Sequence, residues 1–153
     1  MPEDRTFLMG KFPALLPASL HYARNHMWAR AHGDIHRFGF TAYAIRLMQD
    51  VYFLDWNVSA GDAVDLLQPI GHIETSKAVS DLFAPAAGTI TVLNPALLAD
   101  PSGVNVDGYG EGWLFEMACA DDKLMTADEY HRFLADNWEE TQRLIKGKIN
   151  TEE

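Results

Sequence analysis

Apolar positions along most of this chain follow a strand pattern. Residues 51–56 (VYFLDW) are dense in β-branched and aromatic side chains, and in residues 89–92 Ile90 and Val92 alternate with threonines. Such runs, bounded by glycine, asparagine and aspartate, are typical of β-strands. The sequence therefore predicts a mainly β fold. Beside these two segments, we expect strands at residues 27–31, 35–39 and 113–118, with a turn at 32–34.

Two segments carry helical signals instead. Residues 41–48 contain good helix formers, and Thr41 can act as their N-cap. Near the carboxyl end, Thr126 and Glu129 have the spacing of a capping box. We therefore predict a short helix at 41–48 and an amphipathic helix from about Thr126. Its core-facing side follows helical spacing and comprises Tyr130, Phe133, Leu134, Trp138 and Ile145.

The remaining segments lack a clear period. The amino-terminal part, through about Leu20, is interpreted as an irregular arm packed by Phe7, Phe12, Leu15 and Leu16. Residues 94–112 contain four glycines and two prolines, which predict a short helical turn and then a surface loop. We expect one compact domain with an arm at 1–20, a β body at 21–125 and a helix at 126–153 packed on it.

A lysine lies between two of the strand-like segments. Residues 65–74 are mostly apolar with a glycine break, and residues 82–93 again have strand character. The residues between them, Thr75, Ser76 and Lys77, are small or polar, which favours a hairpin whose turn carries Lys77 into solvent. Glu74 and Asp81 flank it, and we interpret them as solvated carboxylates.

Composition and charge narrow the possible functions. The chain has 153 residues, of which 48% are hydrophobic, so it can bury one core. Its net charge of −10 argues against binding to nucleic acid or an anionic membrane, which need clustered basic residues. The single cysteine, Cys119, cannot form an intrachain disulfide, which indicates a reducing, cytoplasmic location. We expect neither a secretory signal nor a membrane span.

Catalytic signatures are missing from the sequence. Six histidines are scattered, and none occurs in a His-Glu-x-x-His arrangement, so no metal site is predicted. No Gly-x-Ser-x-Gly is present, and the glycines of residues 108–112 follow no phosphate-loop strand. We therefore expect a protein without catalytic residues of its own.

The lysine segment and two others resemble the H-protein family of the glycine cleavage system, from roughly His21 to Leu134. The similar stretches are residues 22–44, 71–97 and 104–117; they include Glu-x-x-Lys-Ala at 74–78, Ala84-Pro85, Gly88 and the run at 109–114. This resemblance implies a barrel-sandwich hybrid with terminal helices and a lipoate amide-linked to Lys77. It also implies that Glu74, Ser76 and Ala78 form a recognition hairpin. Biotinyl carriers instead place methionines beside their lysine.

Three upstream segments depart from the usual pattern of that family. The chain has GFTA at 39–42, MQD at 48–50 and LDWN at 54–57, where Gly-Ile-Thr-Asp, Leu-Gly-Asp and Glu-Leu-Pro are common. Residues 53–61 (FLDWNVSAG), together with the extended amino-terminal arm, resemble instead the lipoate-binding protein of a sulfur-oxidising, heterodisulfide-reductase-like system, and this resemblance favours that pathway. Glycine cleavage enzymes are the alternative clients, and an unmodified scaffold is a third possibility. In each carrier case we expect a monomer modified by lipoate-attaching enzymes.

Overall fold

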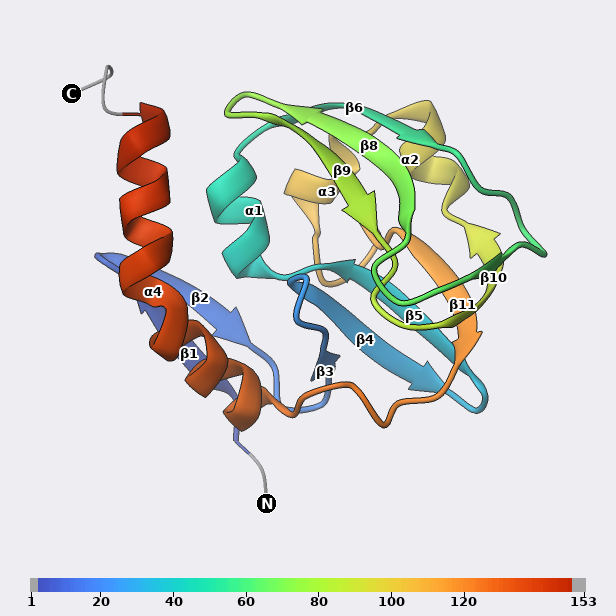
Figure 1. The fold of residues 1–153 in the computed structure, drawn as a ribbon, viewed down its shortest axis with the longest axis horizontal. Helices are drawn as coiled ribbons and strands as arrows, with labels where there is room; N and C mark the ends of the chain where they lie inside the picture. Colours follow the sequence, from blue (N-terminus) through green and yellow to red (C-terminus); the bar gives the residue numbers. More distant parts are fainter. Residues whose placement is uncertain (1–2, 150–153) are drawn as a thin grey trace.

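The computed structural model describes residues 3–149, and side chains only as far as residue 143. Strands and helices follow one another as in Figure 1. The strands are β1 (Arg5–Met9), β2 (Phe12–Leu16), β3 (His21–Tyr22), β4 (Met27–His32), β5 (Ile35–Phe40), β6 (Val51–Trp56), β7 (Ala63–Val64), β8 (Pro69–Thr75), β9 (Val79–Phe83), β10 (Gly88–Leu93) and β11 (Phe115–Cys119). The helices are α1 (Ala42–Met48), α2 (Pro95–Ala99), α3 (Gly103–Val106) and α4 (Ala127–Ile149).

Two antiparallel sheets enclose the main core. One has the strand order β3-β4-β5-β11-β10-β7, and the other has the order β6-β8-β9. Phe38, Ile90 and Phe115 of the first sheet and Leu54 and Ile73 of the second belong to one buried cluster. The structure thus confirms a mainly β fold of two small sheets with a helix at the carboxyl end. It also confirms the strands expected from the apolar pattern, to within two residues at their ends.

Helix α1 begins where its sequence predicts. Thr41 is extended, and its side chain accepts a hydrogen bond from the N–H of Ala44. The helix ends at Gln49, whose positive φ of 64° turns the chain into β6. The N–H of Gln49 still donates to the carbonyl of Ile45, so the last turn of the helix is closed before the chain changes direction. The connection delivers the chain to the sheet that carries Lys77.

The amino-terminal segment is a β-hairpin, so the prediction of an irregular arm was wrong. β1 pairs with β2 antiparallel around a turn at Gly10, whose φ is +66°. Phe7 and Leu16 are buried as expected, but Phe12 and Leu15 are 48% and 46% exposed. Burial alternates along both strands, as a sheet with one covered face requires.

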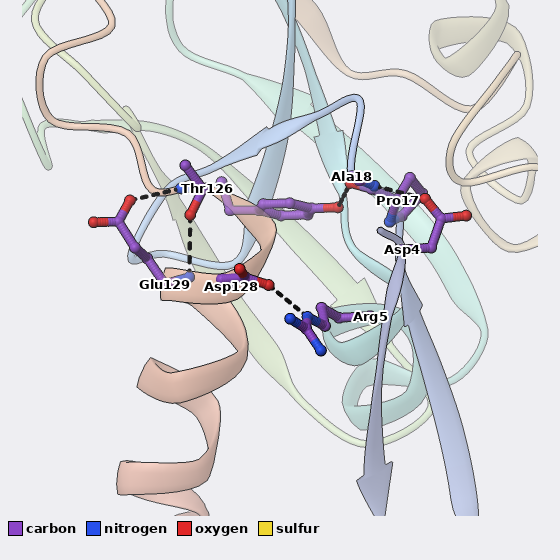
Figure 2. Close-up of polar contacts among 8 residues, drawn as sticks. Asp4, Arg5, Pro17, Ala18, Thr126, Asp128 and Glu129 are labelled. Carbon is purple, nitrogen blue, oxygen red and sulfur yellow. Dashed lines mark hydrogen bonds and ion pairs between the residues drawn. The ribbon is translucent and has the colours of Figure 1, made fainter. Parts of the chain in front are cut away.

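Helix α4 covers the inner face of this hairpin. The capping box is present: the N–H of Glu129 donates to the Thr126 hydroxyl, and Glu129 accepts from the N–H of Thr126 (Figure 2). Tyr130 and Leu134 are buried, whereas Phe133 and Trp138 are half-buried and pack on the same cluster. The inward side is therefore confirmed for these residues. The side chain of Ile145 lies outside the described residues.

The segment at residues 94–112 is more ordered than a surface loop. Asn94 is buried and caps α2 by accepting from the N–H of Ala96, while its amide donates to the carbonyl of Trp113. A second short helix, α3, follows and buries Val104 completely. The prediction of a surface loop rested on the four glycines. Glycine is common in turns, but it is also common where two packed segments come close together. None of the described helices is long and apolar enough to cross a membrane.

Candidate functional site

Lys77 lies at the turn of the hairpin formed by β8 and β9. The two strands pair antiparallel, with Glu74 opposite Val79 and Ile73 opposite Ser80. Lys77 and Ser76 are exposed, and Ala78 is half-buried. The hairpin and the exposed lysine predicted from the sequence are therefore confirmed. The second strand of the hairpin is β9, however, and most of the segment expected at 82–93 belongs to β10 in the other sheet. In Figure 1 the turn of this hairpin lies at the end of the smaller sheet that is nearest α1.

Thr75 holds the turn, a role that sequence reasoning missed. Its hydroxyl accepts hydrogen bonds from the N–H groups of Lys77 (3.2 Å) and Ala78 (3.1 Å) and donates to the carbonyl of Ala78 (3.2 Å). The backbone N–H of Thr75 donates to the same carbonyl at 2.9 Å. A threonine that bonds to the backbone of the next residues is a recognised turn former, so the signal was available.

The turn is also anchored from the neighbouring strand. The N–H of Ser76 donates to the carbonyl of Asp50 (2.9 Å), and the N–H of Asp50 donates to the Ser76 hydroxyl (3.2 Å). Asn105 of α3 then fixes the residues on either side of Asp50. It accepts from the N–H of Val51 (2.9 Å) and donates to the carbonyl of Gln49 (2.7 Å). The backbone of the turn that carries Lys77 is therefore clamped.

The outer face of the three-stranded sheet presents two rows of side chains beside the turn. The strand register puts Glu74 between Phe53 and Val79, and puts His72 between Asp55 and Asp81. His72 Nε2 lies 3.3 Å from a carboxylate oxygen of Glu74.

Large apolar side chains on and beside this face remain in solvent. Val79, Tyr52 and Phe53 are 70%, 64% and 43% exposed. Exposed apolar groups that gather near a reactive amine, with carboxylates beside them, are typical of a surface that other proteins contact.

The sequence-predicted residues around the lysine are brought together by one turn. Glu74 is the next-to-last residue of β8, on the outer face, and Ser76 and Ala78 directly flank Lys77. Their small side chains leave the amine accessible to an attaching enzyme and to the group it would carry. The arrangement therefore fits a covalent attachment site, and its amine can form an amide with a carboxylic acid.

Groups that could supply other chemistry are poorly placed. Within residues 3–149, no three histidine, cysteine or acidic side chains gather as a metal site would require. Cys119 is half-buried, and burial followed by the nearby Asp121 raises the pKa of its thiol to about 11. Such a thiol is almost entirely protonated at neutral pH and is a poor nucleophile.

Comparison with known proteins agrees with this geometry. Residues 20–137 match the family model described as glycine cleavage H-protein. The glycine cleavage system H protein of Rubrobacter xylanophilus is 40% identical over 122 residues, which cover 79% of this chain and 96% of that protein. The corresponding protein of Gloeothece citriformis is 38% identical over 74% of this chain and 90% of its own length.

A solved structure gives the same result. The crystal structure of a glycine cleavage system H protein from Mycobacterium marinum superimposes with a TM-score of 0.68 at 34% identity, over 79% of this chain and 98% of that one. The fold and the lysine turn together define a carrier domain, a compact β body that displays one lysine. The chain belongs to the glycine cleavage H-protein family, whose members are non-catalytic carriers of a lipoyl group.

Two parts of the structure lie outside the family match. The hairpin of β1 and β2 precedes residue 20, and the last part of α4 follows residue 137. They meet in space, because Phe7 of β1 packs edge-on against Trp138 at a ring distance of 5.5 Å. The chain therefore carries an addition to the family fold, made from both of its ends.

Proposed function

We propose that this protein is the carrier component of a glycine cleavage system, with a lipoyl group amide-linked to Nζ of Lys77. The observation that carries the proposal is the exposed Lys77 on a turn clamped by Thr75 and Ser76, in a chain of the H-protein family. Glu74, Ser76 and Ala78 form the surface that a lipoate-attaching enzyme reads. The bound group supplies a dithiolane, which accepts a fragment or two electrons by thiol–disulfide exchange.

The protein itself presents Lys77 to its partners and restrains the backbone of the turn that carries it. The clamped backbone fixes the base of the arm, while the lysine side chain and the lipoyl chain beyond it supply its reach. Tethering replaces free diffusion by an effective concentration commonly in the millimolar range, ~1 mM, at each docked enzyme. The exposed Phe53 and Val79 beside the turn are placed where a client enzyme would have to approach.

The preference for a sulfur-oxidising complex gains no support from the relatives, whose names describe glycine cleavage. The substitutions behind that preference also have roles inside this molecule. Phe40 is buried in the main core, and Ala42 begins α1 and packs against the cluster that contains Phe7 and Tyr130. Trp56 packs edge-on against Phe115 at 5.7 Å, as a residue of the protein's own core would. A different client is not needed to explain them.

Reconstitution tests this pathway. The natively expressed protein is first analysed by peptide mass spectrometry, where we expect lipoyl on Lys77. It is then combined with glycine and a pyridoxal-phosphate-dependent glycine decarboxylase, and we expect turnover comparable to that with the Rubrobacter xylanophilus protein. A lipoylated but inactive carrier would contradict glycine cleavage and return the sulfur-oxidising complex as the client.

An unmodified scaffold is the other alternative to the carrier. Intact mass separates the two, because natively expressed protein without a lipoyl adduct would contradict the carrier proposal itself. Biotin on Lys77, or lipoyl on another lysine, would do the same. The mass measurement therefore tests the modification, and the turnover assay tests the pathway independently of it.

A further inference from the structure

The hairpin of β1 and β2 has one protected edge and one open edge. On β2, Pro13 has no N–H, and the carbonyl of Leu15 accepts a hydrogen bond from the Tyr109 hydroxyl. Proline on an edge strand and a covering side chain are the devices by which proteins prevent an edge from pairing with another chain. The edge of β2 is therefore closed.

The edge of β1 lacks both devices. Met9 and Phe12 flank the two-residue turn and form a hydrogen-bonded pair. Hydrogen-bonded and non-hydrogen-bonded pairs alternate along the hairpin, so Thr6 and Leu8 belong to non-hydrogen-bonded pairs. Their backbone N–H and C=O groups point away from β2. Among the described residues, none makes a hydrogen bond to these outward groups. Thr6 is exposed, and Leu8 is 61% exposed.

The charges along β1 are unequal at its two ends. Glu3 and Asp4 precede the strand, and Lys11 follows it in the turn; all three are exposed, and the carboxylate of Asp4 accepts a hydrogen bond from the N–H of Ala18 at 2.8 Å (Figure 2). Arg5, the first residue of β1, is engaged with Asp128 of α4, as Figure 2 shows. This ion pair lowers the pKa of Asp128. A strand added antiparallel to β1 would thus find acidic residues at its carboxyl end and a lysine at its amino end.

Helix α4 decides what can occupy this edge. It packs on the inner face of β1, where Phe7 contacts the rings of His131 and Trp138 at 5.7 and 5.5 Å. Two β1 strands paired edge to edge would be about 4.8 Å apart and would bring two α4 helices onto one face. Packed helices need interaxial distances of roughly 8–10 Å. A second copy therefore does not fit, whereas an extended segment without a helix does.

We propose that β1 is a docking edge that accepts an extended segment of a partner protein as a third, antiparallel strand. The segment has apolar side chains on the face shared with Leu8, and basic residues opposite Glu3 and Asp4. Pairing of main-chain groups provides affinity, and the alternate side chains provide selectivity, as in other complexes formed by strand addition. The hairpin lies outside the family match, so this partner is specific to chains that carry it.

The test uses the full chain and a defined probe. The probe is a short synthetic peptide of alternating threonine and valine, with glutamate at its amino end and two lysines at its carboxyl end. A control peptide has the charged ends exchanged. Binding is measured by fluorescence anisotropy, and protection of individual amides by NMR hydrogen exchange. We expect saturable binding of the probe, weaker binding of the control, and slower exchange at Thr6 and Leu8.

Variants of the edge decide the outcome. Leu8→Pro removes one outward N–H at the position that faces Pro13, and should weaken binding about tenfold or more. Leu8→Lys, which keeps the hairpin backbone, should also weaken it, whereas Thr6→Val should not. No saturable binding, or equal binding by the three variants, would overturn the proposal. Sedimentation that shows a dimer abolished by Leu8→Lys would also overturn it, in favour of a second copy.

Discussion

Two hairpins in this molecule end in a turn with an exposed lysine, and they are built differently. The turn at Lys77 joins β8 and β9, and the turn at Lys11 joins β1 and β2. Lys77 is the residue after a clamped serine, in a turn whose backbone is fixed by the Thr75 hydroxyl and by Asp50. Lys11 follows Gly10 in a two-residue turn, and a Cβ added to Gly10 would meet open space.

The difference teaches how an attachment site is distinguished from an ordinary surface lysine. Exposure alone does not separate them, because both side chains are exposed. What differs is the support: the Lys77 turn is connected through Asp50 to Asn105 of α3, whereas the Lys11 hairpin is held by its inner face and leaves an edge open. The β8–β9 hairpin has a fixed backbone and presents a side chain, whereas the β1–β2 hairpin presents the outward backbone groups of its edge strand.

Replacement of Lys77 or Lys11 by arginine should produce the largest difference between the two turns. We expect Lys77→Arg to abolish lipoyl attachment and carrier activity completely, because the guanidinium does not form the amide. Lys11→Arg should retain both at the level of the parent protein. Each change should alter the free energy of unfolding by no more than about 0.5 kcal/mol, since both side chains are exposed. Peptide mass spectrometry and thermal unfolding measure these outcomes, and lipoyl on Lys11 would end the distinction between the turns.

Removal of the Phe7 ring should destabilise the β1–β2 hairpin and leave the β8–β9 hairpin unchanged. Its ring is 6% exposed and packs against Tyr43, His131 and Trp138, so Phe7→Ala should cost about 3–4 kcal/mol of unfolding free energy in urea. Lipoyl attachment to the folded protein should be unchanged, because the β body does not depend on this contact. Leu8→Ala, on the exposed face, is the control and should cost little. Equal losses from both would show that the inner face does not hold the hairpin.

Acid should loosen the α4 side of the molecule before the β body. His26 hydrogen-bonds the Tyr130 hydroxyl at 2.9 Å, and burial lowers the pKa of its imidazole to about 4. The unfolded chain takes up this proton near the ordinary pKa of about 6.5, so stability is present above that pH and is lost as pH falls toward 4. We expect a loss of about 2 kcal/mol for this half-buried ring.

The variant His26→Asn gives the control for this pH dependence. The asparagine amide can hydrogen-bond the Tyr130 hydroxyl, and asparagine tolerates the positive φ of 72° at this position. Urea unfolding between pH 7 and pH 4 should then show a flatter profile than in the parent protein. A profile with the same slope would assign the acid sensitivity to other groups.

Loss of the Thr75 hydroxyl should cost less stability than loss of the Phe7 ring or protonation of His26, and its effect on structure should be local. Thr75→Val removes the hydroxyl that bonds the backbone of Lys77 and Ala78, at a cost of about 1 kcal/mol. We expect faster amide exchange at both residues and slower lipoyl attachment. Thr75→Ser keeps the hydroxyl and should behave as the parent protein. If the valine variant is modified at the parent rate, the clamped backbone is not what the attaching enzyme needs.

Local signals in the sequence determined much of this protein. The N-cap at Thr41, the capping box at Thr126 and the hairpin around Lys77 depend on residues within a few positions of each other. Each was predicted from its neighbours and is present in the structure. The arm at the amino end was misjudged because its alternation is short and contains proline. Gly10 and Lys11 between two apolar runs were the available hairpin signal.

Only the tertiary structure decided which long-range contacts support these elements. Asn105 anchors Gln49 and Val51 across separations of 56 and 54 residues, and Tyr109 closes the edge of β2 across 94 residues. No periodicity encodes such pairs, because each forms only after both sheets and the connecting helices have packed. The sequence alone therefore determined which lysine is displayed. The packed structure decided why that turn is rigid and why β1, rather than β2, is the open edge.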